Sequence, residues 1–332
     1  MGKLLPEELK SLLSCIKKDS RVIVPPMVGY DSGVHLFDGK YIAVATDPCT
    51  GVPEEWFGWL LINYAASDVS LSGAKPEFCT INLLGPKSTK PETFQKIMKQ
   101  TCKAADELDI AIVRGHTGTY DSLSGLFGVA TVYGAVQLEK LITPANAKPG
   151  DLIICTKPLG METITNFSIA NKELAKKLFG IEQQENLSKQ VYLQSCVREA
   201  QALVKTGAVH AMHDATEGGF VAALNELAEA SKLGFGLSWE KIPICKELLA
   251  LQSHFKLTDE QLLATSSTGT IIAAIDPQNK EKITEALSQN GLSASFMGEF
   301  SENKDRVLLR NGKQESFPLT SGDPYDRILS GK

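Results

Sequence analysis

Two spacings of hydrophobic and polar residues alternate along the chain. Helical spacing predicts helices at residues 6–18, 55–71, 91–108, 186–206, 220–229 and 278–290. Short apolar runs predict strands at residues 41–46, 77–84, 110–114, 126–136, 151–156, 207–212, 269–275, 294–299 and 306–309. Because helices and strands mix in both halves, the pattern predicts an α/β or α+β class. Turn-forming residues gather at 142–149, so we expect two domains, residues 1–148 and 149–332.

Polar residues stand where several of these strands end. The strand 41–46 ends on Asp47, and the strand 110–114 leads into Gly115-His116-Thr117-Gly118-Thr119. Asp31 lies between two glycines in the turn 29–33. Strand ends often face a cleft, but an aspartate also starts turns for purely local reasons. Each position alone therefore leaves a structural and a functional interpretation open.

The helix predicted at 55–71 carries an acidic residue within its apolar stripe. Trp56, Leu60 and Tyr64 recur at intervals of four residues, and Leu71 resumes the stripe after Asp68. This spacing predicts that Asp68 lies on the inward face of the helix. Because burying an isolated carboxylate is costly, we expect a cation, a metal ion or a solvated pocket beside it.

The stretch 213–220 joins a predicted strand to a predicted helix and carries acidic, hydroxyl and glycine residues at the join. A helix N-terminus offers unpaired N–H groups and a partial positive charge to an anion. Gly218 and Gly219 leave room there for a phosphate. The structural alternative is a helix capped by Asp214 or Thr216.

Four carboxylates are thus candidates for one site: Asp31, Asp47, Asp68 and Asp214. Mg²⁺ prefers oxygen ligands and retains water molecules, so convergence of these groups would make a magnesium–polyphosphate site. The sequence contains no P-loop, dinucleotide-binding, nucleophile-elbow or zinc-protease motif. The phosphate chemistry is therefore expected from the carboxylates rather than from a standard nucleotide motif.

The composition narrows the class of partner. The 332 residues carry a formal net charge of −5 and scattered basic residues, which gives no electrostatic case for nucleic-acid binding. The seven cysteines are irregularly spaced and include no Cys-x-x-Cys pair, which indicates reduced thiols rather than disulfides or structural zinc. No apolar run reaches the length of a signal-peptide core or a membrane span. We therefore expect a soluble, unprocessed cytoplasmic protein with no membrane partner.

Six segments in sequence order carry a family resemblance. They are the Asp31 turn, 45–47, 66–68 with 72–76, 114–117, 147–151 with 157–160, and 213–219. Together they resemble the aminoimidazole ribonucleotide (AIR) synthetase superfamily, which includes HypE hydrogenase maturation factors, thiamine-monophosphate kinase and selenophosphate synthetase. The resemblance implies a two-domain fold whose N-terminal domains pair in a homodimer and bind ATP and Mg²⁺ near the interface. It also implies ATP-driven activation of an oxygen, in which positioning and charge neutralisation dominate catalysis.

The resemblance assigns roles to individual positions. The implied metal and phosphate ligands are Asp31, Asp47, Asp68 and Asp214. Further residues expected to bind ATP are Gly115, Thr117, Thr216, Gly218 and Gly219. The residues expected to act in catalysis are Asp47, Asp214 and His116. His116 stands where many relatives have an acidic residue, and an imidazole binds Mg²⁺ poorly but can donate to a phosphate.

Within the superfamily, the segments 214–220, 222–226 and 267–270 most resemble HypE. HypE ends in a cysteine that carries a carbamoyl group, whereas the last cysteine here is Cys245. We therefore expect HypE-like activation of an oxygen without that terminal thiol, on an unidentified small-molecule or protein-thiol substrate. Cys15, within the predicted helix 6–18, offers no counterpart of the reactive loop of selenophosphate synthetase.

Three alternatives remain. A small-molecule kinase of the thiamine-monophosphate type would leave phosphate on a stable acceptor. A non-catalytic assembly or regulatory protein would keep the fold and a nucleotide-binding site. A transition-metal site would use His35, His116, His210 and His213, although no cysteine or acidic ligand spacing supports it.

Overall fold

The computed structural model describes residues 6–331, which form two compact units. The N-terminal unit comprises residues 17–26 and 31–141, and the C-terminal unit comprises residues 6–16, 27–30 and 142–331. Each unit contains one β-sheet with packed helices, so the predicted mixed α/β class is confirmed. The main crossing from one unit to the other falls between Leu141 and Ile142, within the turn-rich stretch.

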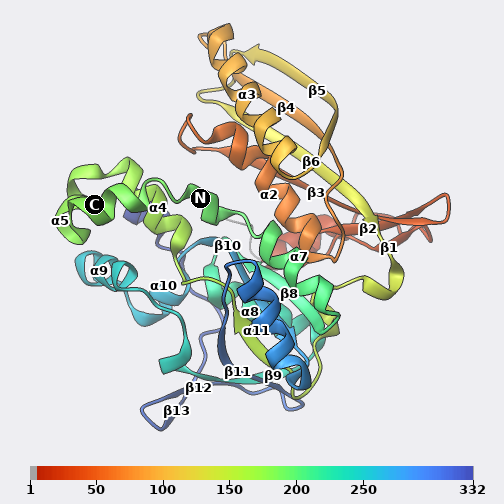
Figure 1. Ribbon diagram of the computed structural model, residues 1–332, viewed down its shortest axis with the longest axis vertical. Helices are drawn as coiled ribbons and strands as arrows, with labels where there is room; N and C mark the ends of the chain where they lie inside the picture. Colours follow the sequence, from red (N-terminus) through yellow and green to blue (C-terminus); the bar gives the residue numbers. More distant parts are fainter. Residues whose placement is uncertain (1–5, 332) are drawn as a thin grey trace. The chain divides into compact units, whose positions relative to one another are not determined.

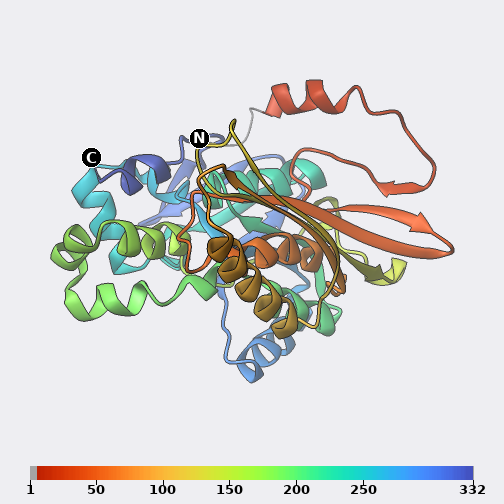
Figure 2. The same ribbon diagram turned by 90° about the horizontal axis from the view of Figure 1, so that it is seen from above.

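The N-terminal unit is a six-stranded sheet with two long helices on one face (Figure 1, Figure 2). Its elements are β1 (Val22–Val24), β2 (Gly33–Phe37), β3 (Lys40–Thr50), α2 (Phe57–Leu71), β4 (Phe78–Pro86), α3 (Pro91–Glu107), β5 (Ala111–Tyr120), β6 (Phe127–Val136) and the short helix η1 (Leu138–Lys140). The strand order is β1-β2-β3-β6-β4-β5, and β4–β5 is the parallel pair. Alternate residues of β3 and β6 are buried, so one face of the sheet meets helix α2.

The C-terminal unit is built on a seven-stranded sheet of order β13-β12-β9-β11-β7-β10-β8. Its first elements are α1 (Pro6–Leu13), η2 (Pro144–Asn146), β7 (Leu152–Cys155), α4 (Met161–Ala170), α5 (Lys172–Phe179), α6 (Ile181–Leu187), η3 (Val191–Gln194), α7 (Val197–Thr206), β8 (Val209–Ala215) and α8 (Gly219–Ser231). The remaining elements are β9 (Gly234–Ser238), η4 (Trp239–Lys241), α9 (Lys246–Phe255), α10 (Asp259–Leu263), β10 (Ser267–Ile275), η5 (Pro277–Asn279), α11 (Lys280–Gln289), β11 (Ser295–Ser301), β12 (Arg306–Arg310), β13 (Lys313–Ser316) and α12 (Tyr325–Leu329). All nine residues of β10 are buried, and α4 and α8 pack against this strand.

Two strands extend further than their apolar runs indicate. The prediction that Asp47 ends a strand is wrong, because β3 continues to Thr50 and pairs with β6 throughout. The prediction that residues 115–119 follow a strand is also wrong, because they lie within β5. Backbone pairing with a neighbouring strand does not require apolar side chains, so polar residues continue both strands.

Three helix predictions need correction. The single helix predicted at 186–206 is interrupted by η3, where buried Gln194 donates to Thr165 and Asn166. Helix α1 ends at Leu13, so Cys15 lies beyond it. The prediction that Asp68 lies on the inward face of its helix is wrong, because α2 is buried almost throughout and Asp68 is one of its partly exposed positions. Contacts made by the folded chain therefore decided where these helices end and which face is open.

Candidate functional site

Two of the candidate carboxylates in the N-terminal unit lie on strand β3 and just before the neighbouring strand β2. Asp47 is a partly exposed residue of β3, and Asp31 comes two residues before β2. Strands β2 and β3 are antiparallel, and Gly33 pairs with Val44. This register directs Asp31 toward the part of β3 that contains Asp47.

The third carboxylate of this unit belongs to the helix that packs on β3. Asp68 lies on α2 in the same row as Tyr64, and both side chains are partly exposed. Partial exposure lowers the cost of keeping a carboxylate ionised and leaves access for a hydrated cation. Asp68 is thus chemically suited to bind a metal ion, although for a different reason from the buried environment predicted from the sequence.

His116 is an exposed residue of the edge strand β5. Its Nε2 lies 3.0 Å from the hydroxyl oxygen of Tyr120, which is on the same strand. Gly115 beside it packs closely on β4, since a Cβ there would lie 3.0 Å from the carbonyl oxygen of Ile81. Thr117 is exposed on the same strand. The hydroxyl of Tyr120 therefore orients the His116 ring at the edge of the sheet.

In the C-terminal unit, Asp214 lies on β8 beside a histidine that is paired with a glutamate. His213 is 1% exposed, and its Nε2 is 2.6 Å from Oε2 of Glu226 on α8. Its Nδ1 is 3.8 Å from Oδ1 of Asp214, which is 3% exposed. Asp214 and His213 therefore belong to a buried acidic and imidazole cluster at the end of β8, whereas the sequence pattern placed them in a loop.

The junction between β8 and α8 has a different cap from the one considered above. Gly218 is the N-cap, without a side-chain cap hydrogen bond, so the alternative that Asp214 or Thr216 caps the helix is wrong. Gly219 has φ +55°, and a Cβ there would lie 2.5 Å from the carbonyl oxygen of Thr265, so only glycine fits. The N–H of Gly218 donates to Oδ2 of Asp323 at 3.2 Å. A carboxylate of the C-terminal segment therefore lies at the N-terminus of α8.

Asp323 is also held by its own segment and by the loop before β10. Its Oδ1 accepts from the N–H of Tyr325 at 2.9 Å and from the N–H of Ser266 at 3.4 Å. Burial raises the pKa of Asp323 despite these hydrogen bonds, because desolvation disfavours the charged form. The only sequence signal for this residue is its turn context, Gly322-Asp323-Pro324.

A second carboxylate missed by the sequence analysis lies on α4. Glu162 Oε2 accepts from the hydroxyl of Thr268 at 2.6 Å and from its N–H at 3.2 Å. Burial raises the pKa of Glu162, with the Thr268 hydrogen bonds opposing the effect and the charge of Asp323 adding to it. The C-terminal unit therefore contains two neighbouring carboxyl groups whose protonated forms are favoured relative to water.

Four of the seven cysteines have raised thiol pKa values and are therefore not activated as thiolates. Burial raises the pKa of Cys49 and Cys155 to about 12 and that of Cys79 and Cys245 to about 11. Because the thiolate is the nucleophile, these four groups are poorly suited to accept a transferred group near neutral pH. All seven cysteines are free, as expected from their spacing.

The two sheets and their junctions correspond to the two parts of one known family. Residues 29–136 match the AIR synthase related protein, N-terminal domain, and residues 148–310 match the AIR synthase related protein, C-terminal domain. The chain belongs to the AIR synthase related family. The family resemblance inferred from the six segments is thereby confirmed.

Named relatives include a putative hydrogenase expression/formation protein and selenide, water dikinases. A putative hydrogenase expression/formation protein of Methanocaldococcus jannaschii is 26% identical over 82% of this chain and 78% of its own length. A selenide, water dikinase of Carboxydothermus hydrogenoformans is 26% identical over 93% of this chain and 95% of its own length. Both alignments extend across the two units, so the similarity is to whole proteins rather than to one domain.

Solved structures share the two-domain fold. HypE in a HypE–HypF complex has a TM-score of 0.73 at 20% identity, covering 93% of this chain and 98% of that chain. HypE in complex with ATP has a TM-score of 0.69 at 18% identity, covering 94% and 91%. ThiL, the thiamine monophosphate kinase of Aquifex aeolicus, with AMPPCP and TMP has a TM-score of 0.68 at 17% identity, covering 94% and 96%. The chain therefore has a HypE-like and ThiL-like fold.

Within residues 6–331, no helix combines the length and the apolar character needed to cross a membrane.

Proposed function

We propose that this protein is an ATP- and Mg²⁺-dependent enzyme that activates a substrate oxygen by phosphoryl transfer. The observation that carries the proposal is the placement of Asp31, Asp47 and Asp68 on contiguous parts of one unit: before β2, on β3 and on the helix packed against β3. Family membership and the ATP-bound and AMPPCP-bound structures of similar fold support the same chemistry.

The three carboxylates fit a magnesium–nucleotide complex by their donor chemistry. All are hard oxygen donors, and all are partly exposed, as an ion that keeps part of its water shell requires. When bound, Mg-ATP would supply the phosphoryl group and neutralise its charge. In our proposal Asp31, Asp47 and Asp68 hold the ion, and Asp214 is assigned as a further metal ligand.

Other residues are assigned to the phosphates and to catalysis. His116, which is oriented by Tyr120, would donate a hydrogen bond to a phosphate oxygen. The phosphate-contacting positions proposed with it are Gly115, Thr117, Thr216, Gly218 and Gly219. At Gly218 the phosphate would take the place of the Asp323 carboxylate that accepts from its N–H. Asp47 and Asp214 would orient the reacting groups through charge.

We further propose that two copies pair through their N-terminal units. The face of the sheet opposite α2 and α3 is open, and β5 is exposed along nearly its whole length. Apolar side chains lie there, including Val113 at 57% exposure and Phe78, whose ring stacks on Tyr133 at 5.6 Å. Pairing would cover an apolar sheet face and the unpaired edge of β5.

We place the protein in the cytoplasm because its seven cysteines are free.

The HypE-like activity is proposed without a carrier thiol. Cys245, the last cysteine in the sequence, is a buried thiol with a raised pKa. A small-molecule kinase of the ThiL type is the second candidate, because the ThiL structure of similar fold holds TMP with AMPPCP. A kinase would leave phosphate on a stable acceptor, whereas an oxygen-activating enzyme would release it.

The first experiment is calorimetric titration of the protein with ATP in the presence and absence of Mg²⁺. We expect binding that needs the ion and that weakens by about tenfold or more in Asp47→Asn and Asp68→Asn, because each variant removes a charged ligand. Asp106→Asn, on the exposed surface of α3, is the matched control and should bind as the parent does.

Two outcomes would contradict the proposal. One is the absence of binding to the intact protein at millimolar ATP with Mg²⁺. The other is unchanged binding in both Asp47→Asn and Asp68→Asn. If binding is confirmed, ATP labelled in the γ-phosphate distinguishes the two candidate activities by the fate of the label.

A further inference from the structure

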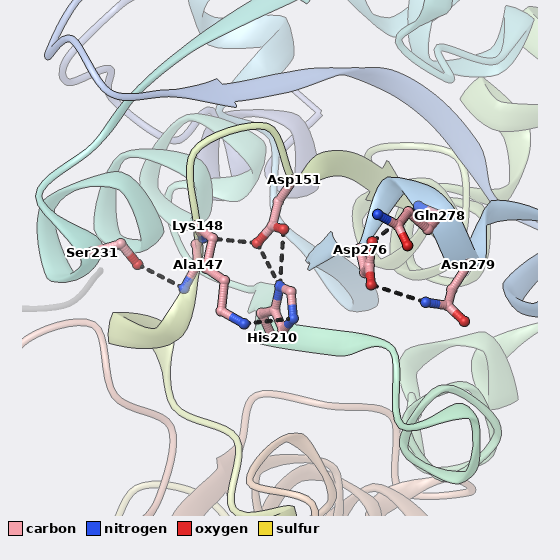
Figure 3. Close-up of polar contacts among 8 residues, drawn as sticks. All are labelled: Ala147, Lys148, Asp151, His210, Ser231, Asp276, Gln278 and Asn279. Carbon is pink, nitrogen blue, oxygen red and sulfur yellow. Dashed lines mark hydrogen bonds and ion pairs between the residues drawn. The ribbon is translucent and has the colours of Figure 1, made fainter.

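Three side chains of the C-terminal unit form a continuous polar chain (Figure 3). Lys148 Nζ lies 3.0 Å from His210 Nε2. On the other side of the ring, His210 Nδ1 lies 2.9 Å from both carboxylate oxygens of Asp151. We call Lys148, His210 and Asp151 the lysine relay.

Hydrogen bonds hold the turn that carries Lys148 and Asp151. Asp151 is 2% exposed, and its Oδ2 also accepts from the backbone N–H of Lys148 at 2.7 Å. The N–H of Ala147 donates to Ser231 on α8 at 3.1 Å, and Gly150 donates to Phe300 on β11 at 2.8 Å. The turn that carries Lys148 is therefore tied to a helix and to a strand.

The hydrogen-bonding capacity of the groups fixes their roles. A lysine ammonium can only donate, so His210 Nε2 must accept from Lys148. A carboxylate can only accept, so His210 Nδ1 must donate to Asp151. In this arrangement the Nδ1 proton is directed at the carboxylate and Nε2 faces the lysine. Asp276 nearby accepts instead from Gln278 and Asn279 (Figure 3).

This arrangement has the parts of an activated nucleophile. The imidazole is within reach to take a proton from the amine, and the buried carboxylate stabilises the imidazolium that forms. Lys148 is exposed, so an electrophile from solution can reach it. Its ammonium charge also favours the approach of an anionic electrophile.

We propose that Lys148 is a nucleophilic lysine that accepts an acyl group from an acyl phosphate, with His210 as general base and Asp151 orienting the ring. The Lys148 ammonium loses one proton to His210, and the resulting neutral amine attacks the acyl carbon. A bond forms between Nζ and that carbon, and the bond from the carbon to the phosphate oxygen breaks. The second amine proton leaves with inorganic phosphate, and the proton on His210 passes to solvent. No oxidation or reduction occurs.

The test uses the full-length chain and acetyl phosphate, without ATP. Acetylation of individual lysines is followed over time by peptide mass spectrometry. Lys96 and Lys176 are internal controls, because each is a lysine paired with a carboxylate. We expect Lys148 to be acetylated at least about tenfold faster than either control, as general-base assistance provides.

The His210→Gln variant tests whether the lysine relay, rather than the exposure of Lys148 alone, accelerates its acetylation. Glutamine can still donate to Asp151 but cannot take up the proton, so Lys148 should fall to the rate of the controls while their rates stay unchanged. Equal rates for Lys148, Lys96 and Lys176 in the parent protein would overturn the proposal, and this comparison needs no variant. An undiminished Lys148 rate in a folded His210→Gln protein would also overturn it. Because ATP is absent, neither result depends on the proposed phosphoryl transfer.

Discussion

Strands β5 and β10 are almost the same length and have opposite environments. In the N-terminal unit, β5 has nine exposed residues and one partly exposed residue, whereas in the C-terminal unit all nine residues of β10 are buried. Both contain glycine and threonine beside apolar residues, but β5 also carries Arg114 and His116, whereas β10 has no charged residue or histidine. Their positions differ as well, because β5 is the edge strand of its sheet and β10 lies between β7 and β8. A polar group on β10 must therefore find a partner inside the protein, whereas β5 keeps groups available at the surface.

The same contrast holds for the ion pairs of the two units. In the C-terminal unit, Lys157 Nζ lies 2.8 Å from Glu199 and also donates to the carbonyl oxygens of Ser195 and Gly269. In the N-terminal unit, Lys96 and Glu54 form an exposed pair at 3.0 Å. The first pair joins the segment after β7 to α7 inside the protein. Water competes for the second pair.

Lys157→Met gives the largest expected effect and tests this contrast directly. It leaves Glu199 charged and buried, which should cost about 3–5 kcal/mol of the free energy of unfolding. Lys96→Met, the exposed control, should cost less than about 1 kcal/mol. Urea unfolding measures both. The double variant Lys157→Met with Glu199→Leu should recover part of the loss, and similar losses for the two single variants would remove the distinction between the units.

A charge on β5 should have the next largest effect. Val113→Glu places a carboxylate on the exposed edge that we propose pairs two copies, and should weaken dimerisation by about tenfold or more, equivalent to about 1.4 kcal/mol. Sedimentation measurements over a range of concentrations report this change. Leu249→Glu, at an exposed position of α9, should leave the oligomeric state unchanged. A monomeric parent protein would contradict the proposed interface.

The smallest expected effect concerns the pH dependence of Glu162. Its pKa in the folded protein is raised above the ordinary value of 4.5, so the folded state binds this proton more tightly than the unfolded state. Its ionisation therefore costs stability as the pH rises from 4.5 through the raised pKa, and the cost is constant above it.

Glu162→Gln removes this ionisation and should make the protein more stable than the parent at neutral pH but not below pH 4.5. Thermal unfolding at a series of pH values measures the difference between the two proteins. Glu173→Gln, an exposed residue of α5, is the control. A difference that does not change with pH would show that burial of Glu162 does not control its ionisation.

The sequence predicted the elements more reliably than their surroundings. Helical spacing located α3 and α11 to within two residues at each end, because a helix is organised by contacts three and four residues apart. The same reasoning failed at 186–206, where Gln194 turns inward to partners almost thirty residues earlier in the chain. It also placed Asp68 on the wrong side of α2, because no apolar stripe is distinguishable when almost every position is buried.

The residues of the candidate site also fall into two groups, those that the sequence indicated and those that only the structure revealed. The carboxylates Asp31, Asp47, Asp68 and Asp214 were visible in the sequence because acidic residues beside glycine turns and apolar runs are conspicuous. Glu162 and Asp323 were not, because each acquires its environment from segments distant in sequence. The lysine relay was missed for the same reason, since His210 is separated from Lys148 by 62 residues.

The sequence by itself determined the mixed α/β class, most of the strands, about half of the α-helices, and the family, because periodicity and motifs can be read directly from the order of residues. Only the tertiary structure decided which polar groups meet. It placed Asp323 at the N-terminus of α8, paired His213 with Glu226, and joined Lys148 to Asp151 through His210. Each of these contacts depends on strand register and helix packing across long separations, and a buried polar group takes its partner from whatever the fold brings within hydrogen-bonding distance.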